Sequence, residues 1–96
     1  MATKILIKRR IPQDLRAQVR DDLIRRLRKL AVVQKGYISG ETLRSVDHPD
    51  EYLVISTWQD PAAWKTWQTN PERIEIQKQI DALLGKPTEY EMYEYI

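Results

Sequence analysis

Three tryptophans are the side chains in this sequence best suited to contact a flat ligand. Trp58, Trp64 and Trp67 lie in one stretch of the chain. Trp64 and Trp67 are three residues apart, so a helix places both rings on one face. Such rings either wall a pocket in which an aromatic substrate stacks or fill a core or an interface. We therefore take Trp67 and Trp64 as candidate substrate-binding residues, with packing as the alternative.

The five tyrosines are the next groups that could meet a phenolic substrate, by hydrogen bonding or by taking its proton. Among them we take Tyr37 as a candidate substrate-binding residue. A phenol side chain ordinarily titrates near pH 10, so a base role needs a strong shift. Tyrosine is also common at dimer interfaces, so structural roles are the alternative. No residue is assigned a catalytic role.

Metal and cofactor chemistry has little support in the composition. His48 is the only histidine, and cysteine is absent. Transition-metal sites ordinarily use several nitrogen or sulfur ligands. His48 lies in a predicted turn beside Pro49, where a histidine is usually exposed and inert, although its near-neutral pKa also suits a proton shuttle. We predict no metal site and no bound cofactor.

Basic residues are concentrated in the first third of the chain. They could bind an anion or nucleic acid, but Asp21 and Asp22 interrupt the run and no aromatic residue lies within it. We interpret the run as a solvated helix face, and we predict no nucleic-acid or membrane partner. The residues concerned are Arg9, Arg10, Arg16, Arg20, Arg25, Arg26, Arg28 and Lys29.

Apolar spacing and turn residues predict the elements that position these side chains. Gly36 ends the first helix, Asp60 caps the second, and Asn70-Pro71 interrupts it. Gly40 marks a possible β-bulge. The expected order is strand 4–10, helix 13–34, strand 37–46, strand 51–58, helix 61–84 and strand 89–96.

This order is βαββαβ, which is the ferredoxin-like α+β pattern. We expect a four-stranded antiparallel sheet with two helices on one face, in a single domain over residues 1–96. Strand 51–58 is apolar on both faces, since Leu53 and Ile55 alternate with Tyr52 and Val54. A second subunit is the economical way to cover the face without helices, so we predict a homodimer.

The bulk properties exclude several classes of protein. The net charge is only +2, and no apolar run is long enough to span a membrane. The chain starts at Met1 without a signal-type segment, so we expect a cytoplasmic protein.

Two segments resemble the antibiotic-biosynthesis monooxygenase-like family: a glycine-led strand over residues 36–44, and a strand over residues 52–58 that ends in Trp58 before a helix opened by a polar residue. The resemblance covers nearly the whole chain. It implies a dimeric α+β barrel in which two sheets pack face to face. It also implies oxygenases that act on electron-rich phenols or quinols without metal or flavin, alongside haem-degrading members.

The haem-degrading branch can be compared residue by residue. That branch has an Asn in the first strand, a Trp in the second helix and, further along that helix, a His that ligates iron. Trp67 matches the Trp, but Gln77 stands where the His is expected, and Asn70 is the only asparagine in the chain. We therefore expect no haem degradation.

Two functions remain after this comparison. The first is a cofactor-independent monooxygenase that acts on a small quinol-like or phenol-like aromatic compound. The second is a non-catalytic small-molecule binding or stress-response protein on the same dimeric scaffold. The lack of an evident acid–base pair favours the second.

Overall fold

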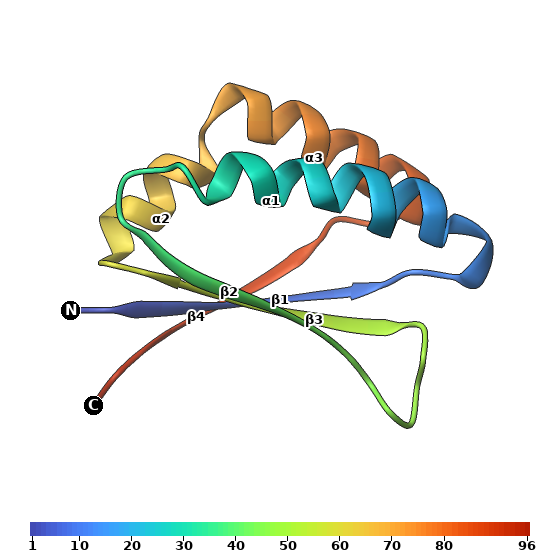
Figure 1. Cartoon of the computed structure of the whole chain (residues 1–96), viewed down its shortest axis with the longest axis horizontal. Helices are drawn as coiled ribbons and strands as arrows, with labels where there is room; N and C mark the ends of the chain where they lie inside the picture. Colours follow the sequence, from blue (N-terminus) through green and yellow to red (C-terminus); the bar gives the residue numbers. More distant parts are fainter.

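A computed structural model describes residues 1–96, and its helices form one layer over one face of a sheet (Figure 1). The strands are β1 (Thr3–Arg10), β2 (Tyr37–Arg44), β3 (Glu51–Trp58) and β4 (Glu89–Glu94), in the order β2-β3-β1-β4. All three neighbouring pairs are antiparallel. The predicted ferredoxin-like α+β fold is confirmed.

The first helical segment is wound differently from the regular α-helix that we expected. It consists of a short 3₁₀ turn, η1 (Gln13–Leu15), a π-helix, η2 (Arg16–Ile24), and an α-helix, α1 (Arg25–Ala31). The apolar residues of this stretch are mostly four positions apart, which is more than the roughly 3.6 residues of one α-helical turn. The i→i+5 bonding of a π-helix winds more slowly and corrects for the overshoot. Val19, Leu23 and Leu27 are accordingly all buried.

The second helical segment divides as predicted, into α2 (Pro61–Gln68) and α3 (Pro71–Leu84). The Asp60 carboxylate accepts a hydrogen bond from the Ala63 amide at 2.8 Å. The Asn70 side chain accepts from the amides of Glu72 and Arg73 at 2.9 and 3.1 Å. Both caps satisfy amides that the first helical turn leaves unpaired.

Several predicted boundaries are corrected. The irregularity in β2 falls between Tyr37 and Ser39, not at Gly40. The strands β2 and β4 end at Arg44 and Glu94, earlier than expected, and α1 ends at Ala31. Frayed ends of this kind are the least predictable part of an element.

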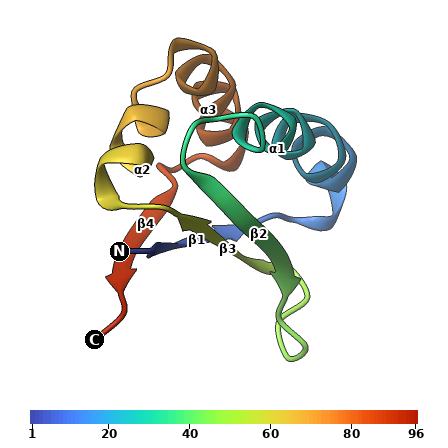
Figure 2. The same ribbon diagram turned by 60° about the vertical axis from the view of Figure 1, so that its left-hand side comes forward.

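The core lies between the sheet and the helices, and the opposite sheet face is bare (Figure 2). In β1 the residues Ile5, Ile7 and Arg9 alternate toward the helices, with Ile5 fully buried. On the bare face, Leu6 pairs with Ile55 and Leu53 with Leu43, and Leu43 is 46% exposed. The apolar character of both faces of β3 is therefore real.

Candidate functional site

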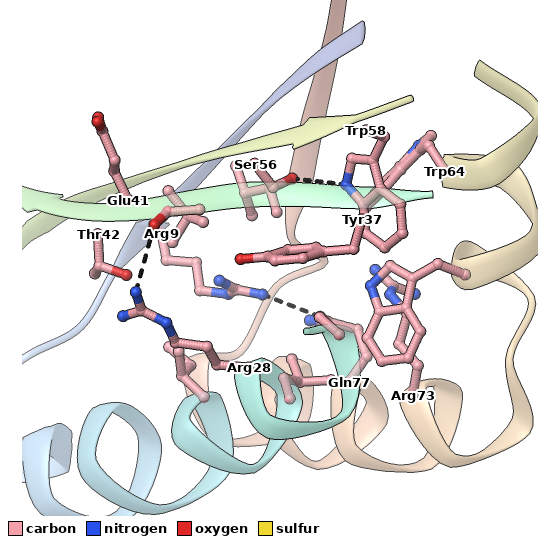
Figure 3. A pocket seen from close by; sticks show the side chains of 17 residues that line it. Arg9, Arg28, Tyr37, Glu41, Thr42, Ser56, Trp58, Trp64, Arg73 and Gln77 are labelled. Carbon is pink, nitrogen blue, oxygen red and sulfur yellow. Dashed lines mark hydrogen bonds between the residues drawn. The ribbon is translucent and has the colours of Figure 1, made fainter. Parts of the chain in front are cut away.

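A cavity of about 80 Å³ opens between the inner face of the sheet and the two helical segments (Figure 3). Its lining comes from β1, β2 and β3 on one side, and from η2, α1, α2 and α3 on the other. This volume is well below the several hundred Å³ of a site for a drug-sized ligand. The residues used below are Arg9, Arg28, Tyr37, Glu41, Ser56, Trp58, Trp64, Trp67, Arg73 and Gln77.

Aromatic rings form one end of this cavity. Trp58 meets Tyr37 edge-on at 5.4 Å between ring centroids and stacks on Trp67 at 6.3 Å. Trp64 contacts Trp58 at 5.9 Å. The Trp58 indole N–H donates to the Ser56 hydroxyl at 3.1 Å, so the buried indole is satisfied. The rings hold one another in place, which gives the cavity a rigid apolar end.

Two glycines allow Tyr37 to reach the cavity. Gly36 has a φ of +87°, and a Cβ there would lie 2.5 Å from the Cβ of Ala63 in α2. A Cβ on Gly40 would lie 2.7 Å from the Tyr37 hydroxyl. The chain therefore passes close to α2 and then lets the Tyr37 ring lie over β2. The Tyr37 hydroxyl points into the cavity (Figure 3).

Arg9 supplies the polar centre of the cavity. Its side chain belongs to the inner face of β1, and the residue is only 7% exposed. Its Nη2 donates to Oε1 of Gln77 at 3.1 Å, while the buried Nε has no hydrogen-bond partner. Burial lowers the pKa of Arg9, reinforced by Arg73 and opposed in part by Tyr90 and Asp81. The guanidinium still stays protonated, because arginine is not deprotonated in proteins.

A short polar network behind Arg9 fixes the position of Gln77. The Gln77 Nε2 donates to Asp81 Oδ1 and to Thr88 Oγ1, both at 2.7 Å. The Thr88 hydroxyl also donates to Asp81 at 2.8 Å. With its NH₂ group held this way, Gln77 presents its carbonyl oxygen to Arg9. The Asp81 carboxylate reaches the guanidinium only through this amide.

A second buried arginine, Arg73, is held in a different way. Its guanidinium donates to the Gln68 carbonyl at 3.2 Å and to the Tyr90 hydroxyl. It also lies over the rings of Trp64 and Tyr90, at 5.6 and 5.2 Å from their centroids. Arg73 therefore packs and fixes the aromatic end of the cavity.

Two further charged residues, Arg28 and Glu41, contribute to the lining. Arg28 of α1 donates to the Gly40 carbonyl at 3.4 Å. Glu41 is the only carboxylate in the lining, and its side chain points away from Arg9 and Tyr37 (Figure 3). The interior is therefore positively charged and contains no carboxylate.

The structure brings the three candidate residues, Trp67, Trp64 and Tyr37, to this one cavity, and their role as ligand contacts stays a prediction. His48 lies elsewhere, exposed in the turn between β2 and β3. The basic residues of α1 are exposed, as predicted, but Arg9 is not and corrects that interpretation.

Three residues of the site escaped the sequence analysis as ligand contacts: Arg9, Arg73 and Gln77. A signal for each exists in the periodicity. Arg9 follows Ile5 and Ile7 in the buried phase of its strand. Arg73 and Gln77 fall on the same helical stripe as Ile80. A charged or amide side chain at a position that the apolar periodicity places in the core indicates a buried polar site.

A ferredoxin-like sheet with a cavity under its helices defines a class of small α+β proteins to which many solved structures belong. Within that class, residues 3–79 match the family described as antibiotic biosynthesis monooxygenase. This chain belongs to that family. No curated protein is a significant sequence match.

Solved structures share the fold across nearly the whole chain. A conserved protein from Methanosarcina mazei Go1 has a TM-score of 0.88 at 18% identity, over 100% of this chain and 94% of that one. Rv0793 from Mycobacterium tuberculosis has a TM-score of 0.86 at 16% identity, over 100% and 96%. The N63A mutant of SnoaB, a cofactor-independent oxygenase from Streptomyces nogalater, has a TM-score of 0.84 at 16% identity, over 98% and 92%. None of the helices combines the length and apolar character needed to cross a bilayer.

Proposed function

We propose that this protein is a cofactor-independent monooxygenase that acts on a small, electron-rich phenol or quinol. The observation that carries the proposal is the cavity that Trp67, Trp58 and Tyr37 line together with a buried arginine. Family membership supports it, as does the similar fold of SnoaB, which is a cofactor-independent oxygenase. We also expect the protein in the cytoplasm, which cell fractionation can test.

The proposed reaction needs no external reductant, because the substrate supplies the electrons. A benzene-1,4-diol and O₂ give a hydroxyquinone and water. The ionised diol transfers an electron to O₂, and the resulting radicals combine to form a C–O bond. The peroxide then loses one oxygen as water, while the other stays on the ring. The protein has to exclude water, hold the ring and favour the ionised form.

The cavity residues divide these tasks. The indole rings of Trp58 and Trp67 border the cavity, and we expect a flat substrate to pack against their exposed edges. The Tyr37 hydroxyl and the Arg9 guanidinium offer hydrogen-bond donors to a ring oxygen. The wall formed by α1 separates this space from bulk water over part of its surface.

The proposal is tested by oxygen consumption with a panel of one-ring and two-ring diols. We expect one O₂ consumed per diol above the rate without protein, and one ¹⁸O atom in the product when ¹⁸O₂ is used. Arg26→Met serves as the control protein, because Arg26 is a surface residue paired with Asp22 at 2.9 Å. A panel with no diol oxidised faster than in buffer would rule the activity out.

The second candidate is a non-catalytic small-molecule binding or stress-response protein. One observation favours it: no carboxylate or imidazole in the cavity is placed to accept a substrate proton. Tight binding of a diol with unaltered oxidation rates would support this reading over the first.

We further propose that the protein is a homodimer joined through the bare sheet face. Leu6, Leu43, Leu53 and Ile55 form a partly exposed apolar area on that face. Soluble proteins seldom leave such a sheet face in water, and a second copy covers it with the same surface. Light scattering that gives the mass of one chain at micromolar concentration would overturn this.

A further inference from the structure

The Arg9 guanidinium is a buried charge without a counter-ion. Its only hydrogen bond within the protein goes to the uncharged amide of Gln77, and its Nε has no partner. A charge removed from water in this way is costly unless it is paired. Packing alone would be served better by an aliphatic residue such as Ile5 or Ile7 on the same face of β1.

The surroundings of Arg9 do not supply the missing negative charge. The nearest acidic group, Asp81, is occupied by Gln77 and Thr88. The Glu41 side chain points away from Arg9 (Figure 3). The other arginines of the lining, Arg28 and Arg73, add positive charge to the same cavity. The field inside this low-dielectric space therefore favours an anion.

Arg9 is the arginine with capacity left for a ligand. Arg73 already donates to Gln68 and Tyr90 and lies over two rings. Arg28 is exposed and donates to the Gly40 carbonyl. By contrast, Arg9 uses one of its five N–H groups and points into the space between Tyr37 and Gln77 (Figure 3).

We propose that the cavity binds the oxyanion of a flat, one-ring ligand, with Arg9 donating to the anionic oxygen and the ring lying against the tryptophans. The oxyanion belongs to a carboxylate or to an ionised phenol, which share the geometry that a guanidinium recognises. The choice of an aromatic body rests on the proposed function. The anion site itself rests on Arg9.

The anion site also explains how a phenol could ionise in a cavity that contains no base. A positive charge beside a phenol favours its ionised form and so lowers the pKa of the bound phenol. A substrate then loses its proton to solvent as it enters the cavity, without help from a carboxylate. The electron-rich phenolate is the species that can reduce O₂.

The test compares ligands that differ in charge but hardly in shape, under nitrogen and without turnover. Benzoate and its neutral isostere benzamide are titrated by calorimetry against the wild-type protein. We expect benzoate to bind at least about tenfold more tightly, as a charge-assisted hydrogen bond in a buried site provides. Equal affinities, or no benzoate binding at about 10 mM, would overturn the proposal.

A second arm separates the two sources of oxyanion. The affinity for phenol is measured as pH rises toward its ionisation near pH 10, with benzoate as the control over the same range. Tighter phenol binding with rising pH, against constant benzoate binding, assigns the site to both kinds of oxyanion. Constant phenol affinity, with benzoate still bound more tightly than benzamide, restricts the site to carboxylates.

Variants then locate the site. Arg9→Met should abolish the preference for benzoate over benzamide, and Arg9→Lys should retain part of it. Arg26→Met, which removes an exposed arginine outside the cavity, should leave it unchanged. A preference that survives in folded Arg9→Met protein would contradict the assignment. Because no oxygen or oxidisable ligand is present, this result stands whether or not the diol assays succeed.

Discussion

Arg9 Nη2 donates to Gln77 Oε1 at 3.1 Å, and this bond joins the first strand of the sheet to the last helix. The two partners are not equally necessary to the fold. Gln77 also bonds to Asp81 and Thr88, whereas Arg9 has no other partner.

Arg9→Met and Gln77→Leu should therefore have unequal effects on stability. Removing Arg9 relieves a buried charge and leaves one amide oxygen unpaired, so we expect the free energy of unfolding to change by less than about 1 kcal/mol. Removing Gln77 leaves the Arg9 charge buried without a partner and breaks the bonds of Gln77 to Asp81 and Thr88. This should lower the free energy of unfolding by about 2–4 kcal/mol. Urea denaturation of both variants measures the difference, and equal losses would refute it.

Trp67→Phe should weaken ligand binding as well as stability. Trp67 is 5% exposed and borders the cavity, so the smaller ring should lower the free energy of unfolding by about 1–2 kcal/mol. It should also change the affinity for a quinol or for benzoate. Ile80→Val, in the core away from the cavity, should cost about 0.5–1.5 kcal/mol with no effect on binding. Thermal melts with and without ligand test both predictions. If neither variant changed ligand binding, Trp67 would have only a packing role.

Gly36→Ala and Gly85→Ala form a matched pair. Both glycines have positive φ, at +87° and +75°, so either alanine meets a backbone strain of about 1 kcal/mol. At Gly36 the new methyl would also collide with Ala63, whereas at Gly85 nothing lies within 4 Å. We expect Gly36→Ala to be the more destabilising by more than 1 kcal/mol, roughly as for other overpacked sites. Chemical denaturation of each variant gives the difference, and similar losses would show that α2 can move aside.

Ile55→Glu should convert the expected dimer into a monomer. Ile55 lies on the bare face of β3, opposite Leu6 and Glu41 in neighbouring strands. A carboxylate there would be buried unpaired in the interface. Val33→Glu changes an exposed residue, at 76%, outside the sheet and should leave the mass unchanged. Light scattering during gel filtration distinguishes these results, and a dimeric Ile55→Glu protein would place the interface elsewhere.

Haemin should not be degraded. Gln77 lies in the cavity wall where the haem-degrading branch is expected to hold its histidine, and its amide is already bonded to Asp81 and Thr88. A haemin titration should give no Soret shift of the His-ligated type and no loss of the macrocycle with reductant. If a shift appears, His48→Ala should remove it, because His48 is the only histidine.

The element order was predictable because each signal in the sequence is local. Asp60 and Asn70 cap the helices that follow them, and the alternation in β3 correctly separates the residues of its two faces. The π-helical winding of Arg16–Ile24 was not predictable from the sequence. Apolar residues four apart fit both an α-helix and a π-helix, which has more residues per turn. The bulge predicted at Gly40 lies instead at the start of β2, and Gly40 leaves room for the Tyr37 ring.

The site was predictable only on its aromatic side. Trp64 and Trp67 share a helical face, and Tyr37 follows a glycine that turns the chain toward them. Arg9 was grouped with the helix arginines because it directly precedes them in the sequence, next to Arg10, which is exposed in the structure. The alternation of Ile5, Ile7 and Arg9 distinguishes the two adjacent arginines, and burial in the structure shows that Arg9 is the one that faces the helices.

The π-helical turns of η2 bear on how large a ligand this protein can admit. Ile24 closes that segment and Leu27 follows it, and both border the cavity. Wide i→i+5 turns are a rare form of helix, so we expect this wall to be the one that changes conformation most readily. Rewinding into narrower turns would turn both side chains around the helix axis and so change this wall of the cavity. Selectivity for ligand size would then follow from the free energy of rewinding a helix, rather than from the shape of the resting cavity.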